Sequence, residues 1–409
     1  MRTRFLTLLA STLLASSCGG GQPAAPSDRL LIVVNAPFSR SAFLGETIAN
    51  GAELAIGQIN EAGGIDIGGR TVGLRLERVD SALSPETALD NVRAAVEEGA
   101  ALILDEGTGV DASWPVASEA RLPICIVYQG GIGLVDPEER PNVFRIAPTD
   151  RGVGFRLAEY LIPKGLRVAF LHDDTAYGQQ GAAVFAEAWG SNPEAVAADV
   201  TVPSGAEDVA PQVLEARRSG ADALLVWARP ETIAKVIRAA RSAGWEAPVY
   251  TPPAGEDPVV RQELFDHPEW VDGLTFAGGR MTAEKGPGPF LDFKAAYEEA
   301  FGPDLVGVLT SAGEEVVQPP DYPMYPYDCV NVFAAAVAAA RSTDPARILD
   351  FMRQVDVQGA NGDERGFNEL SHEGVVDDDV YFAVFHDMTY APVDDDPLSS
   401  TLPEIEQTR

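Results

Sequence analysis

Short apolar runs alternate with amphipathic stretches along most of this chain. The run at 30–34 (LLIVV) predicts a buried strand, and the stretch 47–61 places its apolar residues on one helical face before Gly63 and Gly64 end it. Such alternation is typical of parallel strands joined by crossover helices. In the first half, the predicted strands are 30–34, 72–79, 101–104 and 122–127, and the predicted helices are 47–61 and 86–98.

A second set of the same units begins near Thr149. Its predicted strands are 167–171, 195–202, 223–227, 248–250 and 274–277, and its predicted helices are 151–162, 181–189, 211–219 and 231–243. The chain then returns to helix at 289–300, 327–340 and 346–354 and ends in a strand-like segment at 375–386. Because these late helices lack a full set of strands, we expect them to complete the first half.

Two α/β lobes are therefore expected, each built from two separate parts of the chain. The first lobe combines 30–148 with 281–354, and the second combines 149–280 with 355–390. Residues 391–409 are acidic and contain proline, which predicts a disordered tail.

The N-terminus has the layout of an export signal. Arg2 and Arg4 precede the apolar run 5–15, whose eleven residues are too few to span a bilayer. The residues that lead to Cys18 (LASSC) resemble the lipobox of bacterial lipoproteins, with the leucine one position farther from the cysteine than usual. We expect a signal peptide over 1–18, a lipid on Cys18 that anchors the protein outside the cytoplasm, and a flexible tether over 19–29. An ordinary cleaved signal with an incidental cysteine is the alternative.

The charge of the chain excludes some classes of partner, and its cysteines allow a disulfide. The formal net charge is −32, from 30 basic and 62 acidic residues, which argues against binding nucleic acid and against lying flat on an anionic membrane. We interpret this charge as a solubility feature. Besides Cys18, the chain has Cys125 and Cys329, which are either buried small apolar side chains or a disulfide formed in an oxidising compartment.

Four motifs then occur in order. They are NGAELA…INEAGGI at 50–65, NVFRIAPTD at 142–150, DDTAYG at 173–178 and YD at 327–328. Together they resemble the branched-chain amino-acid-binding proteins of ABC importers, over about residues 30 to 390. The resemblance implies a type I periplasmic binding fold, in which two Rossmann-like (flavodoxin-like) lobes close on a solute. It further implies hinges near 147–150, 278–281 and 355–359, a monomer without a cofactor, and delivery to ABC permease subunits.

Ligands of open α/β sheets bind beyond the carboxyl ends of the strands, so the loops there supply the candidate residues. The resemblance implies that Phe43 or Leu44 covers the solute from loop 37–45; packing beneath the helix is the alternative. It also implies that Thr108 offers donors to a solute carboxylate, whereas Asp105 and Glu106 beside it would repel an anion.

The next loops contribute further candidates. Gly130 and Gly131 leave only backbone donors where the family often has a hydroxyl, and they also suit a tight turn. Tyr177 matches a family tyrosine that stacks on the ligand from the second lobe. Trp227 offers a stacking surface, and Arg229 offers either a bidentate partner for a carboxylate or a surface charge.

The loop after 248–250 departs from the family pattern. An acidic residue is expected there to hold an α-ammonium group, but the matching positions are Pro253 and Ala254, with Glu256 two or three positions later. Either Glu256 substitutes, or the solute is not recognised as an ordinary amino acid. The stretch 306–324 is either a lid or a surface excursion.

Catalysis is not expected, and neither is a metal. The chain contains no HExxH, CxxC, GxSxG or GxxxxGK[ST] motif, and its histidines are scattered, at His172, His267, His372 and His386. The sequence therefore predicts a binding protein for a small polar solute such as an amino acid, an amide or a small carboxylate. A ligand-sensing receptor component on the same fold is the alternative.

Overall fold

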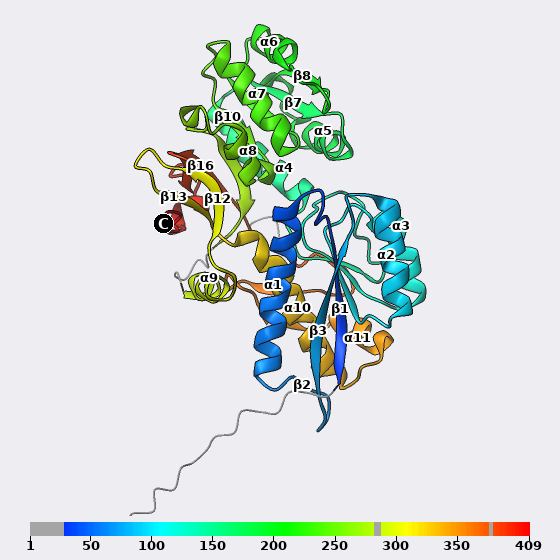
Figure 1. Cartoon of the computed structure of the whole chain (residues 1–409). Helices are drawn as coiled ribbons and strands as arrows, with labels where there is room; N and C mark the ends of the chain where they lie inside the picture. The colour runs from blue at the N-terminus through cyan, green and yellow to red at the C-terminus, as the bar shows by residue number, and fades with distance from the viewer. Residues whose placement is uncertain (1–27, 282–287, 376–378) are drawn as a thin grey trace, which may run out of the picture.

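Two twisted sheets form the centres of two lobes in the computed structural model, which describes residues 28–281, 288–375 and 379–409 (Figure 1). The first sheet has the order β2 (Ile65–Asp66), β3 (Thr71–Asp80), β1 (Arg29–Ala36), β4 (Leu102–Asp105), β5 (Ile124–Ile126) and β6 (Val143–Arg145). The second has the order β17 (Thr389–Pro392), β16 (Val380–His386), β11 (Thr275–Gly279), β10 (Val249–Thr251), β9 (Ala223–Trp227), β7 (Val168–Asp173) and β8 (Val196–Val202).

Strand pairing within both sheets is parallel, apart from β2–β3, β11–β16 and β16–β17. The prediction of an α/β fold with two parallel-stranded lobes is therefore confirmed. Two short hairpins lie outside the sheets: β12 (Asp304–Leu309) with β13 (Glu315–Gln318), and β14 (Asp356–Gln358) with β15 (Glu364–Gly366).

Helices cover both sheets (Figure 1). Those that pack on the first sheet or beside its helices are α1 (Ala42–Glu61), α2 (Pro85–Glu97), α3 (Val110–Glu119), α9 (Gly288–Phe301), α10 (Asp321–Ala340) and α11 (Pro345–Met352). Those of the second lobe are α4 (Asp150–Leu161), α5 (Ala176–Trp189), α6 (Ala210–Arg218), α7 (Pro230–Ser242) and α8 (Pro258–Glu263). Short 3₁₀ turns occupy Ile162–Lys164, Pro193–Ala195, Pro253–Gly255, Pro268–Trp270 and Ser399–Thr401.

The pleat of β1 explains why all five of its residues 30–34 are apolar. Successive side chains of a strand point to opposite faces, and a parallel sheet is covered on both. Leu31 and Val33 therefore join the core beneath α2 and α3, while Ile32 and Val34 join the core beneath α1 and α10. All four are at most 3% exposed.

The boundaries between the lobes differ from those expected. The hairpin β12–β13 packs against α8 of the second lobe, although 281–354 was assigned to the first. Conversely, β14 and β15 pack on α10, and the His372 ring stacks on Phe144 of β6, so 355–375 lies with the first lobe. Only from about Val380 does the chain rejoin the second sheet.

Two of the three predicted hinges lie where the chain passes between the lobes, at 147–150 before α4 and at 278–281 after β11. The third, near 355–359, is wrong, because those residues form β14 on the first lobe and the crossing comes after Val375. A buried ion cluster sits beside these crossings: Arg365 contacts Asp328 of α10 at 3.3 Å and Asp379 at 3.0 Å.

The predicted disorder of 391–409 is also wrong. Asp396 accepts hydrogen bonds from Arg156 and Ser399, and the Gln407 amide donates to the Tyr390 carbonyl at 2.6 Å. Gln407 is 5% exposed. These acidic and amide side chains form hydrogen bonds within the fold. The composition of 391–409 was therefore not sufficient to predict disorder. The predicted signal peptide 1–18 and most of the tether 19–29 lie outside the described residues.

No helix within 28–281, 288–375 and 379–409 combines the length and apolar character needed to cross a bilayer.

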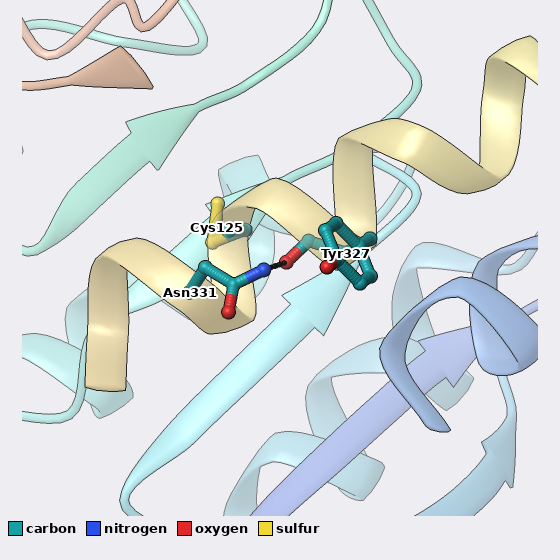
Figure 2. The surroundings of a disulfide bond; sticks show 4 residues. Cys125, Tyr327 and Asn331 are labelled. Atoms are coloured by element: carbon teal, nitrogen blue, oxygen red, sulfur yellow. Dashed lines mark hydrogen bonds between the residues drawn. A yellow bond between two sulfur atoms is a disulfide. The ribbon is translucent and has the colours of Figure 1, made fainter. Parts of the chain in front are cut away.

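Helix α10 is bound to the first sheet by a disulfide. Cys125 of β5 and Cys329 of α10, 204 residues apart, form the bond, and both are fully buried. Figure 2 shows this bond beside the helical turn in which Asn331 donates to the Tyr327 carbonyl at 3.0 Å. A disulfide of this kind persists in an oxidising compartment, which agrees with an extracytoplasmic protein.

We predict that removing this disulfide lowers stability substantially. Closing so long a loop restricts the unfolded chain, with a chain-entropy limit of about 5 kcal/mol and typical values of about 2–4 kcal/mol. Guanidinium unfolding with and without dithiothreitol should show that loss for the wild type. The C125A/C329A double variant, as the control, should have the lowered stability and ignore dithiothreitol. An unchanged wild-type midpoint after reduction confirmed by mass spectrometry would contradict the prediction.

Candidate functional site

Three tyrosines from different elements meet between the lobes. Tyr128 follows β5, Tyr177 lies in the first turn of α5, and Tyr322 lies in the first turn of α10. The ring centroids of Tyr128 and Tyr322 are 5.6 Å apart. The Tyr322 hydroxyl donates to the Pro253 carbonyl of the second lobe at 3.1 Å, which links the lobes directly. All three rings are partly exposed.

Carboxyl groups surround these rings. Burial and then the charges of Asp257, Glu106, Glu256 and Asp150 raise the pKa of Tyr128. Asp150 also acts on Tyr177, and Asp257 on Tyr322. The interlobe junction is the name used below for this set: Tyr128, Tyr177, Tyr322, Glu106, Asp150 and Asp257.

The loop after β4 uses its own backbone donors. The N–H of Gly107 donates to Asp105 Oδ1 at 2.7 Å, and the N–H of Thr108 donates to Glu106 Oε1 at 3.0 Å. The Thr108 hydroxyl accepts from the Gln129 amide at 2.8 Å. The Thr108 hydroxyl and the Gln129 amide also hydrogen-bond to Glu106. These donors of Thr108, Gly107 and Gln129 are therefore used within the loop itself.

Gly130 and Gly131 serve close packing of the β5 loop. A Cβ at Gly130 would lie 2.5 Å from the Asp150 nitrogen and 2.6 Å from Asp150 Oδ1, so no larger residue fits. The N–H of Asp150 donates to the Gly130 carbonyl at 2.8 Å, and the Gly131 carbonyl accepts from Arg145 at 2.9 Å. The tight approach allows the loop to touch the start of α4.

Tyr177 is held from below by Trp227. Their ring centroids are 6.0 Å apart, and Trp227 is only 1% exposed. Gly181, one turn along α5, makes room, because a Cβ there would lie 2.4 Å from the indole ring. The predicted stacking of a solute on Trp227 is therefore corrected to a supporting role. Arg229 is exposed and donates only its backbone N–H, to Asp173 at 2.8 Å.

Glu256 lies beside the junction, where its charge acts on Tyr128 and Tyr322, but its side chain is enclosed. It is 1% exposed, and its Oε1 accepts from the Tyr390 hydroxyl at 2.6 Å and from the Gln318 amide at 3.1 Å. Its contact with a solute stays a prediction, and these two partners already use Oε1. The next residue, Asp257, caps α8 by accepting from the Val259 N–H at 2.9 Å and remains partly exposed beside Tyr128.

Glu256 and Asp321 form a carboxyl pair that needs a proton. Glu256 Oε2 and Asp321 Oδ1 are buried and have no donor among the described residues when both groups are ionised. A protonated Glu256 donates to Asp321 and satisfies both. Burial and then the Asp321 charge raise the pKa of Glu256 well above its ordinary value, and burial raises the pKa of Asp321 to about 6.

Burial likewise raises the pKa of the junction carboxyls. It raises the pKa of Asp150 to about 6 and of Asp257 to about 6. For Glu106, burial and then the Asp105 charge raise the pKa to about 7. The junction is thus a partly dry space that penalises its own negative charge.

Phe43 lies apart from these contacts. It is in the first turn of α1 and partly buried, and among the described residues no ring contact of its side chain is recorded; the ring that packs on α1 at Gly45 is Phe38. A hollow of about 420 Å³ occurs elsewhere, on the flank of the first lobe between Gln58, Phe293 and Tyr327. It brings together none of the predicted site residues.

Sequence reasoning missed Tyr128, Asp150, Asp257 and Tyr322. Tyr128 follows the predicted strand 122–127 directly, and Asp150 ends the motif at 142–150, so both were within reach of a search of strand ends. Tyr322 lies in a stretch read as a lid or excursion. Its place depends on α10 docking from far along the chain, which no local pattern reveals.

Within the described ranges, no group of three or more histidine, cysteine, aspartate or glutamate side chains converges in a way that could hold a metal ion.

Residues 35–387 match the family described as periplasmic binding protein. The chain belongs to this family. The resemblance to its branched-chain amino-acid-type members is confirmed, and the family implies a place outside the cytoplasm.

Relatives of this periplasmic binding protein span nearly the whole chain. An amino acid binding protein of Pseudomonas aeruginosa is 27% identical over 368 residues, covering 86% of this chain and 89% of the relative. A Leu/Ile/Val-binding protein homolog of Brucella melitensis is 25% identical, covering 83% and 86%. These relatives are named as binding proteins rather than as enzymes.

Solved structures show the same fold. A type 1 periplasmic binding protein from Bordetella pertussis has a TM-score of 0.76 and 22% identity, covering 90% of this chain and 100% of that one. The branched-chain amino acid transporter substrate binding protein LivJ of Streptococcus pneumoniae, solved with isoleucine, has a TM-score of 0.74 and 19% identity, covering 89% and 98%.

We predict that Glu256→Gln stabilises this periplasmic binding protein selectively at high pH. Since the folded-state pKa of Glu256 is raised, the wild type keeps this contribution below the unfolded pKa and loses it as pH rises toward the folded value. Glutamine mimics the protonated form. Urea unfolding at pH 5 and pH 8 should show E256Q gaining about 1–2 kcal/mol over wild type at pH 8 relative to pH 5.

The exposed Glu97→Gln is the matched control and should show no such pH dependence, because Glu97 lies at the end of α2 in solvent. An E256Q effect of equal size at both pH values would exclude the shared proton.

Proposed function

We propose that this protein captures a small polar solute between its lobes outside the cytoplasm and delivers it to the permease subunits of an ABC importer. The observation that carries the proposal is the interlobe junction. Tyr128 and Tyr322 come from the first lobe, whereas Tyr177 and Asp257 come from the second. A solute that touches all of them holds the lobes together, and a closed pair of lobes is a state that a transporter can distinguish.

The relatives support the same proposal. The Pseudomonas aeruginosa relative is named for amino acid binding, and LivJ was solved with isoleucine. The solute itself is not carried over from these names, because the loops that contact it differ here. Glu256 is hydrogen-bonded to Tyr390 and Gln318, and the N–H donors of Gly107 and Thr108 are occupied.

A thermal-shift screen of amino acids, amides, short carboxylates and amines tests this function. Binding to the folded state raises the melting temperature by mass action. If no compound raises it, solute capture is contradicted.

For a compound that binds, we predict that Tyr177→Ala weakens affinity about tenfold or more, which corresponds to about 1.4 kcal/mol, measured by calorimetry. The reason is the loss of a ring that both faces the junction and rests on Trp227. Tyr327→Ala, on the flank of the first lobe, is the control and should leave affinity unchanged. Unchanged affinity in a folded Y177A variant would remove Tyr177 from the site.

The lipid anchor is part of the proposal and rests on Cys18, which lies outside the described residues. We predict that wild-type protein fractionates with membranes and that Cys18→Ala releases it into the soluble extracytoplasmic fraction, because the lipid would have no attachment point. Ser11→Ala, within the same signal, should fractionate as wild type. Membrane association that survives in C18A would contradict the anchor.

A further inference from the structure

The end of the second sheet lies where the chain passes between the lobes. Strands β11 and β16 pair antiparallel, with Gly279 opposite Val380. The ladder continues for one more step, because the N–H of Arg280 donates to the Asp379 carbonyl at 2.8 Å. Arg280 and Asp379 therefore belong to the second lobe, although each is next to a crossing.

Arg365 of β15 joins this end of the second sheet to α10 of the first lobe. Its Nη1 donates to Asp379 Oδ2 at 3.0 Å, and its Nε donates to Asp328 Oδ2 at 3.3 Å. Its Nη2 donates to Asn361 Oδ1 at 3.2 Å. The donors of the planar guanidinium have a fixed geometry, so they bind these partners together only when the partners lie in one arrangement.

The turn between β14 and β15 makes a second connection at the same place. Asn361 Nδ2 donates to the Arg280 carbonyl at 2.9 Å, and Asp363 Oδ1 lies 3.7 Å from Arg280 Nη1. This hairpin belongs to the first lobe, since both of its strands pack on α10. The hinge cluster is the name used below for this set: Arg365, Asn361 and Asp363 of the first lobe with Arg280 and Asp379 of the second.

The charges of Arg365 and its partners are enclosed. Arg365 is 1% exposed, Asp379 is 5% exposed and Asp328 is 0% exposed. Gly359 allows the close approach, because a Cβ there would lie 2.6 Å from Asp328 Oδ2 and 2.8 Å from Arg365 Cγ. Since little water screens these charges, the attraction between Arg365 and Asp379 depends more steeply on their separation than it would at the surface.

Rotation of one lobe against the other would change the geometry around Arg365. Asp328 is fixed in α10, whereas Asp379 moves with β16. A different angle between the lobes would therefore lengthen one of the two contacts, and a buried charge that loses its partner is costly. A buried ion pair adds little net stability over apolar packing, but it can specify one arrangement of its partners.

We propose that Arg365 is a positioning residue of the hinge, which restricts the angle between the lobes by holding the end of the β11–β16 ladder against α10. It acts through Asp379 and not through contact with a solute. The inference goes beyond the proposed function, because it concerns the protein without solute and does not depend on what the interlobe junction binds.

Spin labels on the two lobes test this proposal in the full chain without solute. Glu97→Cys at the end of α2 and Glu215→Cys on α6 place one label on each lobe at exposed positions. Cys125 and Cys329 are bonded to one another, and Cys18→Ala removes the remaining thiol. Double electron–electron resonance then measures the distribution of distances between the labels. Measurement at pH 8 keeps Asp328 ionised, because burial raises its pKa to about 6.

Asp379→Asn and Asp328→Asn form a matched pair of variants. Each removes one carboxylate charge from Arg365, but only Asp379 belongs to the second lobe. We expect D379N to widen the distance distribution, with added population at longer separations, and D328N to keep the wild-type distribution. Urea unfolding should show that both variants lose stability, because each leaves the buried Arg365 with one negative partner fewer.

A purely structural role of Arg365 predicts a different result. Either a wild-type distribution in folded D379N or an equal widening in D328N would overturn the positioning role. If D379N does not fold, Arg365→Lys decides, because lysine keeps the charge but lacks the planar set of donors that binds both carboxylates. We expect R365K to widen the distribution, and a wild-type distribution in folded R365K would overturn the proposal. Solute capture is tested separately by the thermal-shift screen, so the two proposals can fail independently.

Discussion

The docking of α10 onto the first sheet is the constraint on which the rest of the structure depends. Along this one helix, Asp321 meets Glu256, Tyr322 reaches the second lobe, Asp328 receives Arg365, and Cys329 is bonded to Cys125. Close approach is built in, because a Cβ at Gly51 of α1 would lie 2.1 Å from the carbonyl oxygen of Pro323 in α10. The helix therefore joins the core, the crossings between the lobes and the interlobe junction in a single element.

Electrostatics at the junction follow from how its loops close on themselves. The loop after β4 carries two carboxyl groups, Asp105 and Glu106, which accept from its nearest backbone N–H groups. Hydrogen bonds of this kind hold the loop in place but do not remove the negative charge of its carboxylates. At Asp150 and Asp257, burial raises the pKa of each carboxyl. Ordered loops and carboxyl groups with raised pKa values thus occur together at the junction.

Much of the fold could be predicted from the sequence, because apolar runs and cap residues are local signals. The predicted strand 223–227 agrees with β9, and the predicted helix 86–98 agrees with α2 to within one residue at each end. What failed depended on distant partners. The hairpin β12–β13 carries exposed Leu305 and Leu309 and is recognised only by its packing on α8. The predictions of the third hinge and of disorder over 391–409 were wrong for the same reason. At the site, the motif positions identified the correct loops. They did not reveal that Glu256 would be buried and that Asp257 would remain partly exposed, because this depends on where α8 begins.

The discontinuity of both lobes has a consequence for how the protein folds. The sheet that begins with β1 lacks one of its covering helices until residues 321–340 are available, and the last strand of the second sheet ends at Pro392. Contacts between such remote residues close late and slowly, because the loop must be closed before the contacts stabilise it. During synthesis from the N-terminus, neither lobe can therefore complete its fold until these C-terminal segments have been made. Completion of both lobes thus depends on residues 321–392 of the chain, which supply α10 and the strands β16 and β17.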